Sequence, residues 1–252
     1  MNQYKTASAE ILEFLRQTDT CAVSNAIESL DVRMRNDGYI HNGPRCMFPE
    51  LPAVAGYAVT GRIRTTVPPV IRNRCYYTSP EWWEYVADAP APKIIVLLDK
   101  DDAPAVGALF GEIHMEISKA FGCVAYISNG AIRDMPALKA GNFPCFAGGV
   151  SPSHAYAHII EYGEPIEIGT LKITSGDLLH ADCHGVLKIP LEIADQLPQR
   201  VSQILSREAK LIDLCRTAEF SFEKLRDVLA AADTFQPFVQ QDRLLTQKGN
   251  ES

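Results

Sequence analysis

The chain of 252 residues is long enough to bury a sizeable core, as one large domain or as one domain with an appendage. Its composition, 46% hydrophobic and 22% charged, is typical of a folded globular protein. The net charge of -7 argues against a general nucleic-acid binder, which needs a basic face. It does not exclude acidic small-molecule substrates, because one arginine can dominate a pocket.

The cysteines and the N-terminus indicate the cellular setting. The seven cysteines are scattered and never spaced as CxxC, which fits free thiols in a reducing compartment. The first residues contain no apolar signal segment, and no stretch approaches membrane-spanning length. We therefore expect a soluble cytoplasmic protein with no membrane partner.

The N-terminal third predicts helices before a strand. Residues 7–30 read as two short helices, the second capped by Asp19 or Thr20. Polar residues with glycine and proline predict irregular structure over 31–53, and small and β-branched residues predict a strand over 54–66. The proline-rich segment 67–92 contains a helix start at Ser79-Pro80.

The centre alternates strands and helices. The apolar run Lys93–Asp99 predicts a strand buried on both faces, and a helix (107–120), a strand (123–128), a short helix from about 135 and a strand (144–147) follow. This alternation predicts parallel pairing with right-handed crossovers. The remainder predicts short strands, then helices and a frayed tail: strands at 165–174, 177–182 and 186–189, helices at 191–217 and 221–232, and the tail from Gln240.

Arg133 and Asp134 follow a predicted parallel strand through the run Asn129-Gly130-Ala131-Ile132, at a sheet edge where ligands usually bind. The glycine-bracketed loop of Gly107, Ala108, Leu109 and Phe110 precedes Glu112 and opens on the same edge. Backbone N–H groups at a helix start bind anions, so this loop and Arg133 are candidates for gripping a substrate carboxylate. Asp134 and Glu112 offer hard oxygen ligands for Mg²⁺ or Mn²⁺.

Structural interpretations of the same residues stay open. Asp134, two residues before Pro136, has the pattern of a helix N-cap. Arg133 also fits a solvated surface residue, and Glu112 an ordinary acid of a first helical turn.

Other candidates are weaker. His154 and His158 lie four apart without an HExxH glutamate, which favours capping or surface roles. His180, Asp182 and His184 alternate along a predicted strand and offer metal ligands, but glycines at 176 and 185 favour a tight strand–turn–strand element. Cys145 and Cys183 fall in predicted strands and are expected in the core.

Several short segments together resemble the RraA-like family, which contains 4-hydroxy-4-methyl-2-oxoglutarate / 4-carboxy-4-hydroxy-2-oxoadipate aldolases and the regulator of ribonuclease activity A. The similarity covers roughly residues 20 to 215. Its segments are Val23–Ala26, Gly56–Thr60, Glu112 with its spacing to Gly122, Asn129–Asp134, Phe143–Phe146 and Ser175–Val186.

The resemblance implies a layered, swivelling β/β/α fold. With the helices predicted at both ends of the chain, we expect an α/β protein that has N-terminal helices and a helical C-terminal extension. The expected domain boundaries are an RraA-like catalytic domain over 1–217 and the extension with its flexible tail over 218–252. The resemblance also implies homotrimers or homohexamers with active sites between subunits. In the aldolase members, the residue matching Asp134 holds Mg²⁺ or Mn²⁺, the one matching Arg133 binds pyruvate and its enolate, and an acid matching Glu112 shares the site. A glutamate from a neighbouring subunit's C-terminal helix assists proton transfer there, and Glu208 is the candidate.

Three departures from the family pattern stand out. Asn129 replaces the usual aspartate, Ala137 stands where the aldolases carry an acid, and segment 67–92 and the C-terminal extension exceed the compact members.

The leading hypothesis is a class II pyruvate aldolase or oxaloacetate decarboxylase-like lyase that cleaves a small 4-hydroxy-2-oxo acid to pyruvate and a second oxo acid. One alternative is a non-catalytic regulator that binds a protein partner. Another is an enzyme of a different oxo or sugar acid, motivated by two tryptophans and a basic cluster of Arg62, Arg64, Arg72 and Arg74.

Overall fold

The computed structural model describes residues 4–70 and 80–233. Arg72, Arg74 and the tail from Gln240 lie outside the described residues. No helix in the described ranges is both long and apolar enough to cross a lipid bilayer.

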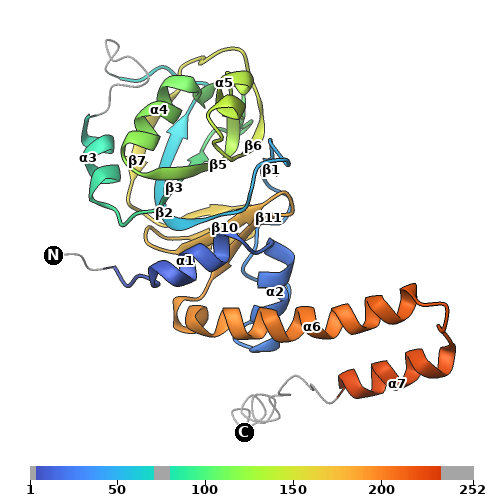
Figure 1. The fold of residues 1–252 in the computed structure, drawn as a ribbon. Helices are drawn as coiled ribbons and strands as arrows, with labels where there is room; N and C mark the ends of the chain where they lie inside the picture. The colour runs from blue at the N-terminus through green and yellow to red at the C-terminus, as the bar shows by residue number, and fades with distance from the viewer. Residues whose placement is uncertain (1–3, 71–79, 234–252) are drawn as a thin grey trace, which may run out of the picture.

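A mixed sheet of nine strands forms the centre of the molecule, with the order β1-β6-β5-β3-β2-β10-β11 (Figure 1). Strand β4 adds to β5, and β7 adds to β2. The strands of this sheet are β1 (Arg45–Cys46), β2 (Val54–Arg64), β3 (Lys93–Asp99), β4 (Ala108–Phe110), β5 (Cys123–Ile132), β6 (Cys145–Val150), β7 (His158–Tyr162), β10 (Leu178–Asp182) and β11 (Gly185–Ile189). A separate hairpin pairs β8 (Ile166–Ile168) with β9 (Leu171–Ile173).

The predicted parallel core is confirmed. Strands β2, β3, β5 and β6 run parallel, and helices α4 (Glu112–Ala120) and α5 (Met135–Ala140) make the crossovers between β3, β5 and β6. Parallel strands need such crossovers, which bury both faces of the sheet. Their carboxyl ends therefore meet at one edge.

Both faces of the sheet are covered, and Figure 1 shows the helices that cover one of them. Helices α3 (Pro80–Asp88), α4 and α5 cover one face of the sheet, where Trp82, Phe110 and Tyr126 are among the buried side chains. The β8–β9 hairpin packs on the other face against Ile94 and Ala125.

The N-terminal helices pack on β10 and β11 together with the C-terminal region. Of the two residues predicted to cap the second helix, Asp19 is the N-cap: its side chain accepts from the Ala22 N–H at 2.9 Å at the start of α2. The hydrophobic core between these helices and strands includes Leu15, Val23 and Leu197. These helices are α1 (Ala9–Arg16), α2 (Thr20–Ser29), the 3₁₀ helix η1 (Leu191–Gln196) and α6 (Leu197–Arg216).

Helix α6 buries only its first turns, at Leu197 and Val201, and then extends beyond the body with α7 (Phe222–Asp233) beside it (Figure 1).

Three elements differ from the prediction. The helix predicted from residue 107 begins at Glu112, because Ala108–Phe110 pair with β5 as a short buried strand. Strand β7 was not expected, and it pairs antiparallel with the end of β2. Strand β5 also continues four residues beyond its predicted end, to Ile132. Each difference arises from pairing between segments distant in sequence.

Candidate active site

Arg133 and Asp134 lie immediately after β5, at the carboxyl edge of the parallel strands. The Arg133 backbone N–H donates to the Phe110 carbonyl at 3.0 Å, which extends the β4–β5 pairing by one residue. Asp134 adopts a left-handed conformation with φ 54°, a geometry that aspartate tolerates better than most residues. This turn sends the chain into α5 and leaves both side chains partly exposed, 29% for Arg133 and 36% for Asp134.

The Asp134 carboxylate contacts both the start of α4 and the Arg133 side chain. Its Oδ2 atom accepts from the Glu112 N–H at 3.1 Å, and its Oδ1 atom lies 3.3 Å from Arg133 Nε. Asp134 holds the N-cap position of α5 but makes no side-chain capping bond there. Its carboxylate instead supports the first turn of α4, where the helix dipole favours negative charge. Arg133, Asp134 and the backbone of Glu112 are therefore brought together, and the exposed Glu112 side chain starts from the same point.

Gly111 allows this close approach. A Cβ atom at this position would lie 2.5 Å from Asp134 Oδ2 and 2.8 Å from Arg133 Cγ. Only a residue without a side chain leaves room for both groups against the start of α4.

The segment Gly107–Phe110 lies next to the end of β5 that leads to Arg133. Ala108, Leu109 and Phe110 are buried, and the Ala108 N–H donates to the Ser153 carbonyl at 2.8 Å. These residues form part of the sheet rather than an open anion-binding loop. A direct contact between them and a ligand stays a prediction.

Asn129 and Asp99 brace the same edge. The Asn129 side chain accepts from the Asp99 N–H at 2.7 Å through Oδ1 and donates to the Asp99 carbonyl at 3.0 Å through Nδ2. Aspartate has no amide donor, so the departure from the family pattern has a structural reason here. Asp99 in turn accepts from the Ala105 and Asp101 N–H groups at 3.0 and 3.1 Å, and burial raises the pKa of its carboxyl. Sequence reasoning missed Asp99, although it ends the apolar run that predicted β3.

Helix α4 carries a buried histidine. His114 is 3% exposed and packs between the rings of Trp83 and Phe110, and burial lowers its pKa to about 4. His154 Nδ1 lies 2.7 Å from the Ala108 carbonyl, and His158 Nδ1 lies 2.7 Å from the Tyr156 carbonyl. Both surface histidines therefore interact with backbone.

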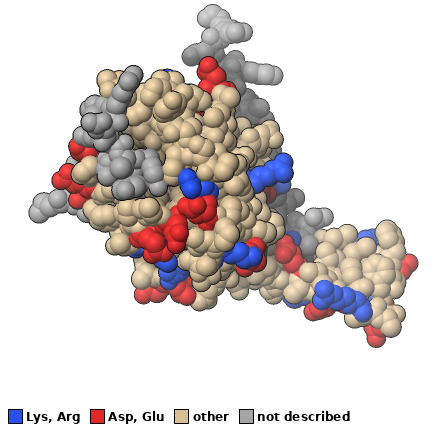
Figure 2. Space-filling view, turned by 90° about the horizontal axis from the view of Figure 1, so that it is seen from above, with Lys and Arg blue, Asp and Glu red and all other residues tan. Residues whose placement is uncertain are grey.

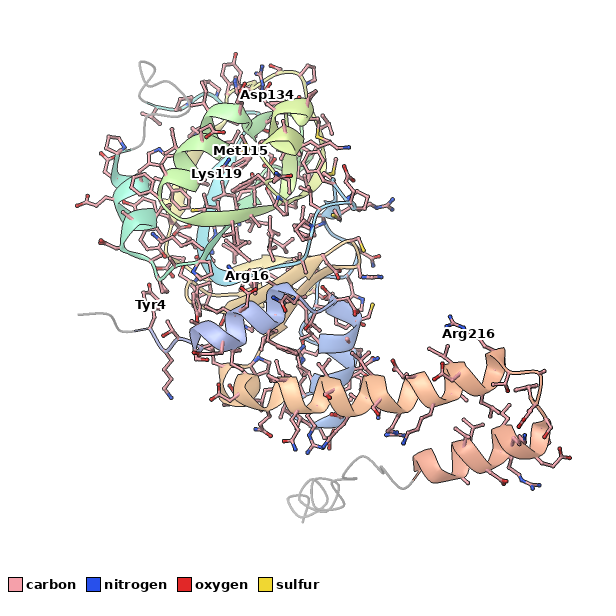
Figure 3. All side chains as sticks on the ribbon, in the orientation of Figure 1. Tyr4, Arg16, Met115, Lys119, Asp134 and Arg216 are labelled. Carbon is pink, nitrogen blue, oxygen red and sulfur yellow. The ribbon has the colours of Figure 1, made fainter. Side chains whose placement is uncertain are left out.

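Two other predicted groups lie elsewhere. Glu208 is exposed on α6. Helix α6 lies at the opposite end of the molecule from Asp134, which Figure 3 labels. Arg62 pairs with Glu161 and donates to the Pro165 carbonyl at 2.7 Å. These contacts engage Arg62 in the packing of β2 against β7, which removes one support for a basic substrate pocket.

The surface at the end of the molecule that carries α4, α5 and Asp134 is mixed in charge. Figure 2 shows acidic and basic side chains next to one another on a largely uncharged face, without one extended basic field.

The second histidine cluster divides into two parts. His180 is fully buried and bonded on both ring nitrogens, to Thr20 Oγ1 at 2.9 Å and to the Leu15 carbonyl at 2.8 Å. It therefore belongs to the core and not to a metal site. Asp182 and His184 lie in the β10–β11 turn with Cys183, which is exposed and not in the core as expected. Cys145 is buried, as expected.

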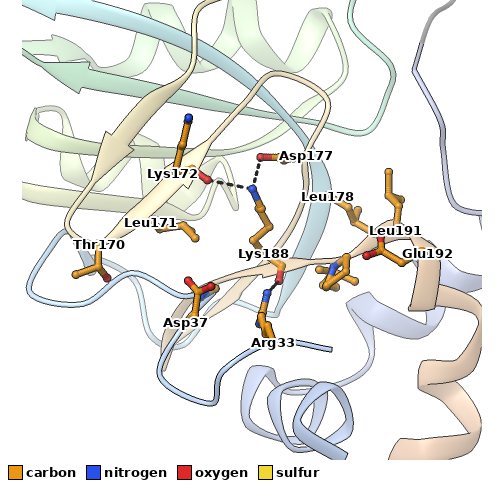
Figure 4. A pocket seen from close by; sticks show the side chains of 13 residues that line it. Arg33, Asp37, Thr170, Leu171, Lys172, Asp177, Leu178, Lys188, Leu191 and Glu192 are labelled. Carbon is orange, nitrogen blue, oxygen red and sulfur yellow. Dashed lines mark hydrogen bonds and ion pairs between the residues drawn. The ribbon is translucent and has the colours of Figure 1, made fainter. Parts of the chain in front are cut away.

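Two cavities lie away from Arg133 and Asp134. One of about 490 Å³ is lined by residues of β9, β10, β11 and the preceding loops, where Lys188 Nζ contacts Asp177 Oδ2 at 2.8 Å and Arg33 Nη1 donates to the Lys188 carbonyl at 2.7 Å (Figure 4). The other, of about 240 Å³, lies between α2 and β11. In the first, charged side chains of both signs are bonded to one another or to backbone.

Comparison with known proteins connects this site to a family. Residues 20–187 match the RraA-like profile described as Aldolase/RraA. A Halalkalibacterium halodurans protein named "Putative 4-hydroxy-4-methyl-2-oxoglutarate aldolase" is 34% identical over 104 residues, which are 41% of this chain and 49% of that protein. The match thus spans about half the length of that relative.

Solved structures share the fold. A Pseudomonas syringae protein of uncharacterized function has a TM-score of 0.68 and 21% identity, covering 90% of this chain and 97% of that one. A Streptomyces coelicolor protein, titled an unusual member of the RNase ES inhibitor RraA protein family, has a TM-score of 0.62 and 19% identity, covering 85% of this chain and 100% of that one.

Proposed function

The chain belongs to the RraA-like family, and on that basis we propose that it is a divalent-metal-dependent lyase. The proposed substrate is a small 4-hydroxy-2-oxo acid, cleaved to pyruvate and a second oxo acid, and decarboxylation of oxaloacetate would use the same site. The single observation that carries the proposal is the contact of the Asp134 carboxylate with both Arg133 and the start of α4.

Arg133 is the proposed substrate-binding group. Its Nε atom lies against Asp134, and within the described ranges its two Nη atoms have no acceptor from the protein. A guanidinium presents these atoms as a planar fork that matches a carboxylate. In the same position its charge stabilises negative charge that develops on the substrate when the carbon–carbon bond breaks.

Asp134 is the proposed metal ligand. Its carboxylate is partly exposed, and each oxygen makes one polar contact with the part of the chain that the structure describes, which leaves lone pairs for a cation. A single carboxylate is a donor set that fits Mg²⁺ or Mn²⁺, since Mg²⁺ is usually held by one or two carboxylates and several waters. When bound, such an ion supplies Lewis-acid polarisation of the 2-oxo group. The Glu112 N–H fixes the orientation of the carboxylate.

Proton transfer is proposed for Glu112 and Glu208. Glu112 starts at the site and its side chain is exposed. Glu208 lies far from Asp134 within one chain, so its participation requires a second copy in a homotrimer or homohexamer. The part of α6 beyond Val201 buries little in the single chain, which leaves that face open for such a contact.

The test is pyruvate release from oxaloacetate and from 4-hydroxy-4-methyl-2-oxoglutarate, with Mg²⁺ or Mn²⁺ and with EDTA. Asp134→Ala is expected to remove metal-dependent turnover. Glu116→Ala, which removes an exposed acid from the same helix α4, is the control and is expected to keep it. Turnover that neither EDTA nor Asp134→Ala reduces would refute the proposal.

A second candidate is a non-catalytic regulator of a ribonuclease. The first turn of α5 carries no acid, because Ala137 stands there, and this favours a site that has lost catalytic groups. The fold shared with a protein titled as an RNase ES inhibitor family member is compatible with it. This candidate predicts no pyruvate release under any metal condition and dose-dependent inhibition of an RNase E-type enzyme. The lyase proposal predicts the opposite pair of results.

A further inference from the structure

Three consecutive residues with metal-binding side chains lie where β10 ends and turns into β11. Asp182, Cys183 and His184 each offer one donor atom, and these atoms all lie within 4.8 Å of one another. Among the described residues this is the one such group of three.

The distances suit one tetrahedral ion. His184 Nδ1 lies 3.1 Å from Asp182 Oδ1 and 3.5 Å from Cys183 Sγ. Bond lengths of about 2.3 Å to sulfur and about 2.0–2.1 Å to nitrogen and oxygen give tetrahedral edges of roughly 3.3–3.6 Å around Zn²⁺. These two separations differ from the tetrahedral edges by only a few tenths of an ångström, and the donor atoms of the third pair, Asp182 and Cys183, lie within 4.8 Å. Rotation of the two exposed side chains, Cys183 and His184, would close the remaining difference.

The carboxylate is already fixed. Asp182 is 8% exposed, and its Oδ2 atom accepts from the Thr20 N–H at 2.8 Å, while Oδ1 accepts from the His184 N–H at 2.8 Å. A tight turn by itself accounts for the bond from the His184 N–H to Asp182 Oδ1. Such a turn does not require a thiol and an imidazole next to the carboxylate.

A further soft donor comes from a different element. Cys21, in the first turn of α2, lines the cavity of about 240 Å³ together with His184. Its Sγ atom is not part of the group whose donor atoms lie within 4.8 Å of one another, so Cys21 joins that group only after its side chain rotates toward His184.

This place is distinct from the Arg133–Asp134 site. Ala181 pairs with Val54, the first residue of β2, so the turn lies beyond the amino end of the parallel strands. Asp134 lies beyond their carboxyl end. A metal at one edge is therefore independent of the proposed chemistry at the other.

We propose that Asp182, Cys183 and His184, joined by Cys21, bind one thiophilic transition-metal ion of the zinc class. Thiolate and imidazole ligands select Zn²⁺ and its chemical relatives over Mg²⁺, which prefers oxygen. The ion links the β10–β11 turn to the start of α2. These segments are far apart in the sequence, since Thr20 and His180, which hydrogen-bond to each other beside the turn, are 160 positions apart.

The experiment is a competition titration of the metal-free, reduced full chain with Zn²⁺ against a chromophoric chelator, with Co²⁺ absorption as the second readout. One equivalent is expected, with a thiolate-to-cobalt charge-transfer band. Cys183→Ser and His184→Ala are each expected to weaken binding by about 100-fold, and Cys21→Ser by about 10-fold. The side chains of Cys183 and His184 are exposed, so their variants are expected to fold, which circular dichroism checks.

Cys215→Ser is the matched control, because it removes an exposed thiol from α6 and is expected to leave affinity and spectrum unchanged. Asp134→Ala is also expected to keep the Zn²⁺ equivalent. The proposal is overturned if the wild-type chain binds no Zn²⁺ in competition, or if Cys183→Ser and His184→Ala bind it as tightly as the wild type. Unchanged binding by Cys21→Ser overturns the assignment of that residue.

Discussion

Gly111→Ala places one methyl group where the two proposed active-site side chains need the space. The added Cβ would lie 2.5 Å from Asp134 Oδ2 and 2.8 Å from Arg133 Cγ. Gly111 has φ -152°, an extended conformation that alanine adopts freely, so the backbone is not strained by the change. The effect is therefore steric and falls on Arg133 and Asp134 themselves.

The size of the effect follows from these contacts. Non-bonded heavy atoms prefer separations of about 3.5–4.0 Å, so Asp134 Oδ2 has to move by about 1 Å. Overpacking of this kind costs about 1–3 kcal/mol, and the lost freedom of the unfolded chain returns about 0.4–1 kcal/mol. We expect the free energy of unfolding to fall by about 1–2 kcal/mol. A displacement of about 1 Å in catalytic groups lowers kcat/KM by about 100-fold.

Gly149→Ala provides the matched control at the same sheet edge. Its added Cβ would meet only Ala105 Cβ, at 3.6 Å, an ordinary contact. Pyruvate release is measured for both variants with Mg²⁺, and urea denaturation reports their stability. The reasoning is refuted if Gly111→Ala turns over substrate as fast as Gly149→Ala while both remain folded.

Three further predictions concern stability and pH. Asn129→Asp replaces the donor to the Asp99 carbonyl by an acceptor, and urea denaturation at pH 7 is expected to show a loss of about 1–3 kcal/mol; wild-type stability would contradict this account. His114 has a pKa lowered to about 4, so the folded state binds fewer protons than the unfolded state. Stability is therefore expected to fall as the pH drops from about 6.5 through about 4, by up to about 3 kcal/mol, and denaturation midpoints across that window should change less in His114→Phe. His180→Ala removes a buried ring bonded at both nitrogens, and thermal or urea unfolding should show a loss of about 2–4 kcal/mol, whereas an unchanged midpoint would contradict its structural role.

The parts of the fold that were predictable depend on local chemistry. The unbroken apolar run of β3 identified a strand buried on both faces, and its bounds agree with the structure at Lys93–Asp99. The cap of α2 was predictable because Asp19 acts on a residue only three positions away. The alternation of strands and helices predicted parallel pairing, and β3, β5 and β6 do pair in parallel, since strands joined by a crossover helix run in the same direction.

The missed parts depend on distant partners. Strand β4 has three residues, too few for a periodic signal in the sequence. It forms because Ala108 and Phe110 pair with Ala131 and Ile132 of β5. The bracing of Asp99 by Asn129 joins residues 30 positions apart. Sequence alone identified Asn129 as a departure from a family pattern, but its reason became visible only with the backbone that it bonds.

The sequence left two interpretations of Asp134 open, a helix cap and a metal ligand, and the structure is compatible with both. Its carboxylate caps α4 rather than α5, and it also offers a charged oxygen to a cation. Asp134→Asn separates the two interpretations. The amide oxygen still accepts from the Glu112 N–H, so most of the capping energy of about 1 kcal/mol is kept, but the charge that would attract Mg²⁺ is gone. Asp134→Ala loses both. If the carboxylate is only a cap, stability and any turnover change together across the two variants. If it holds the metal, the asparagine variant unfolds at nearly the wild-type urea concentration and yet releases no pyruvate.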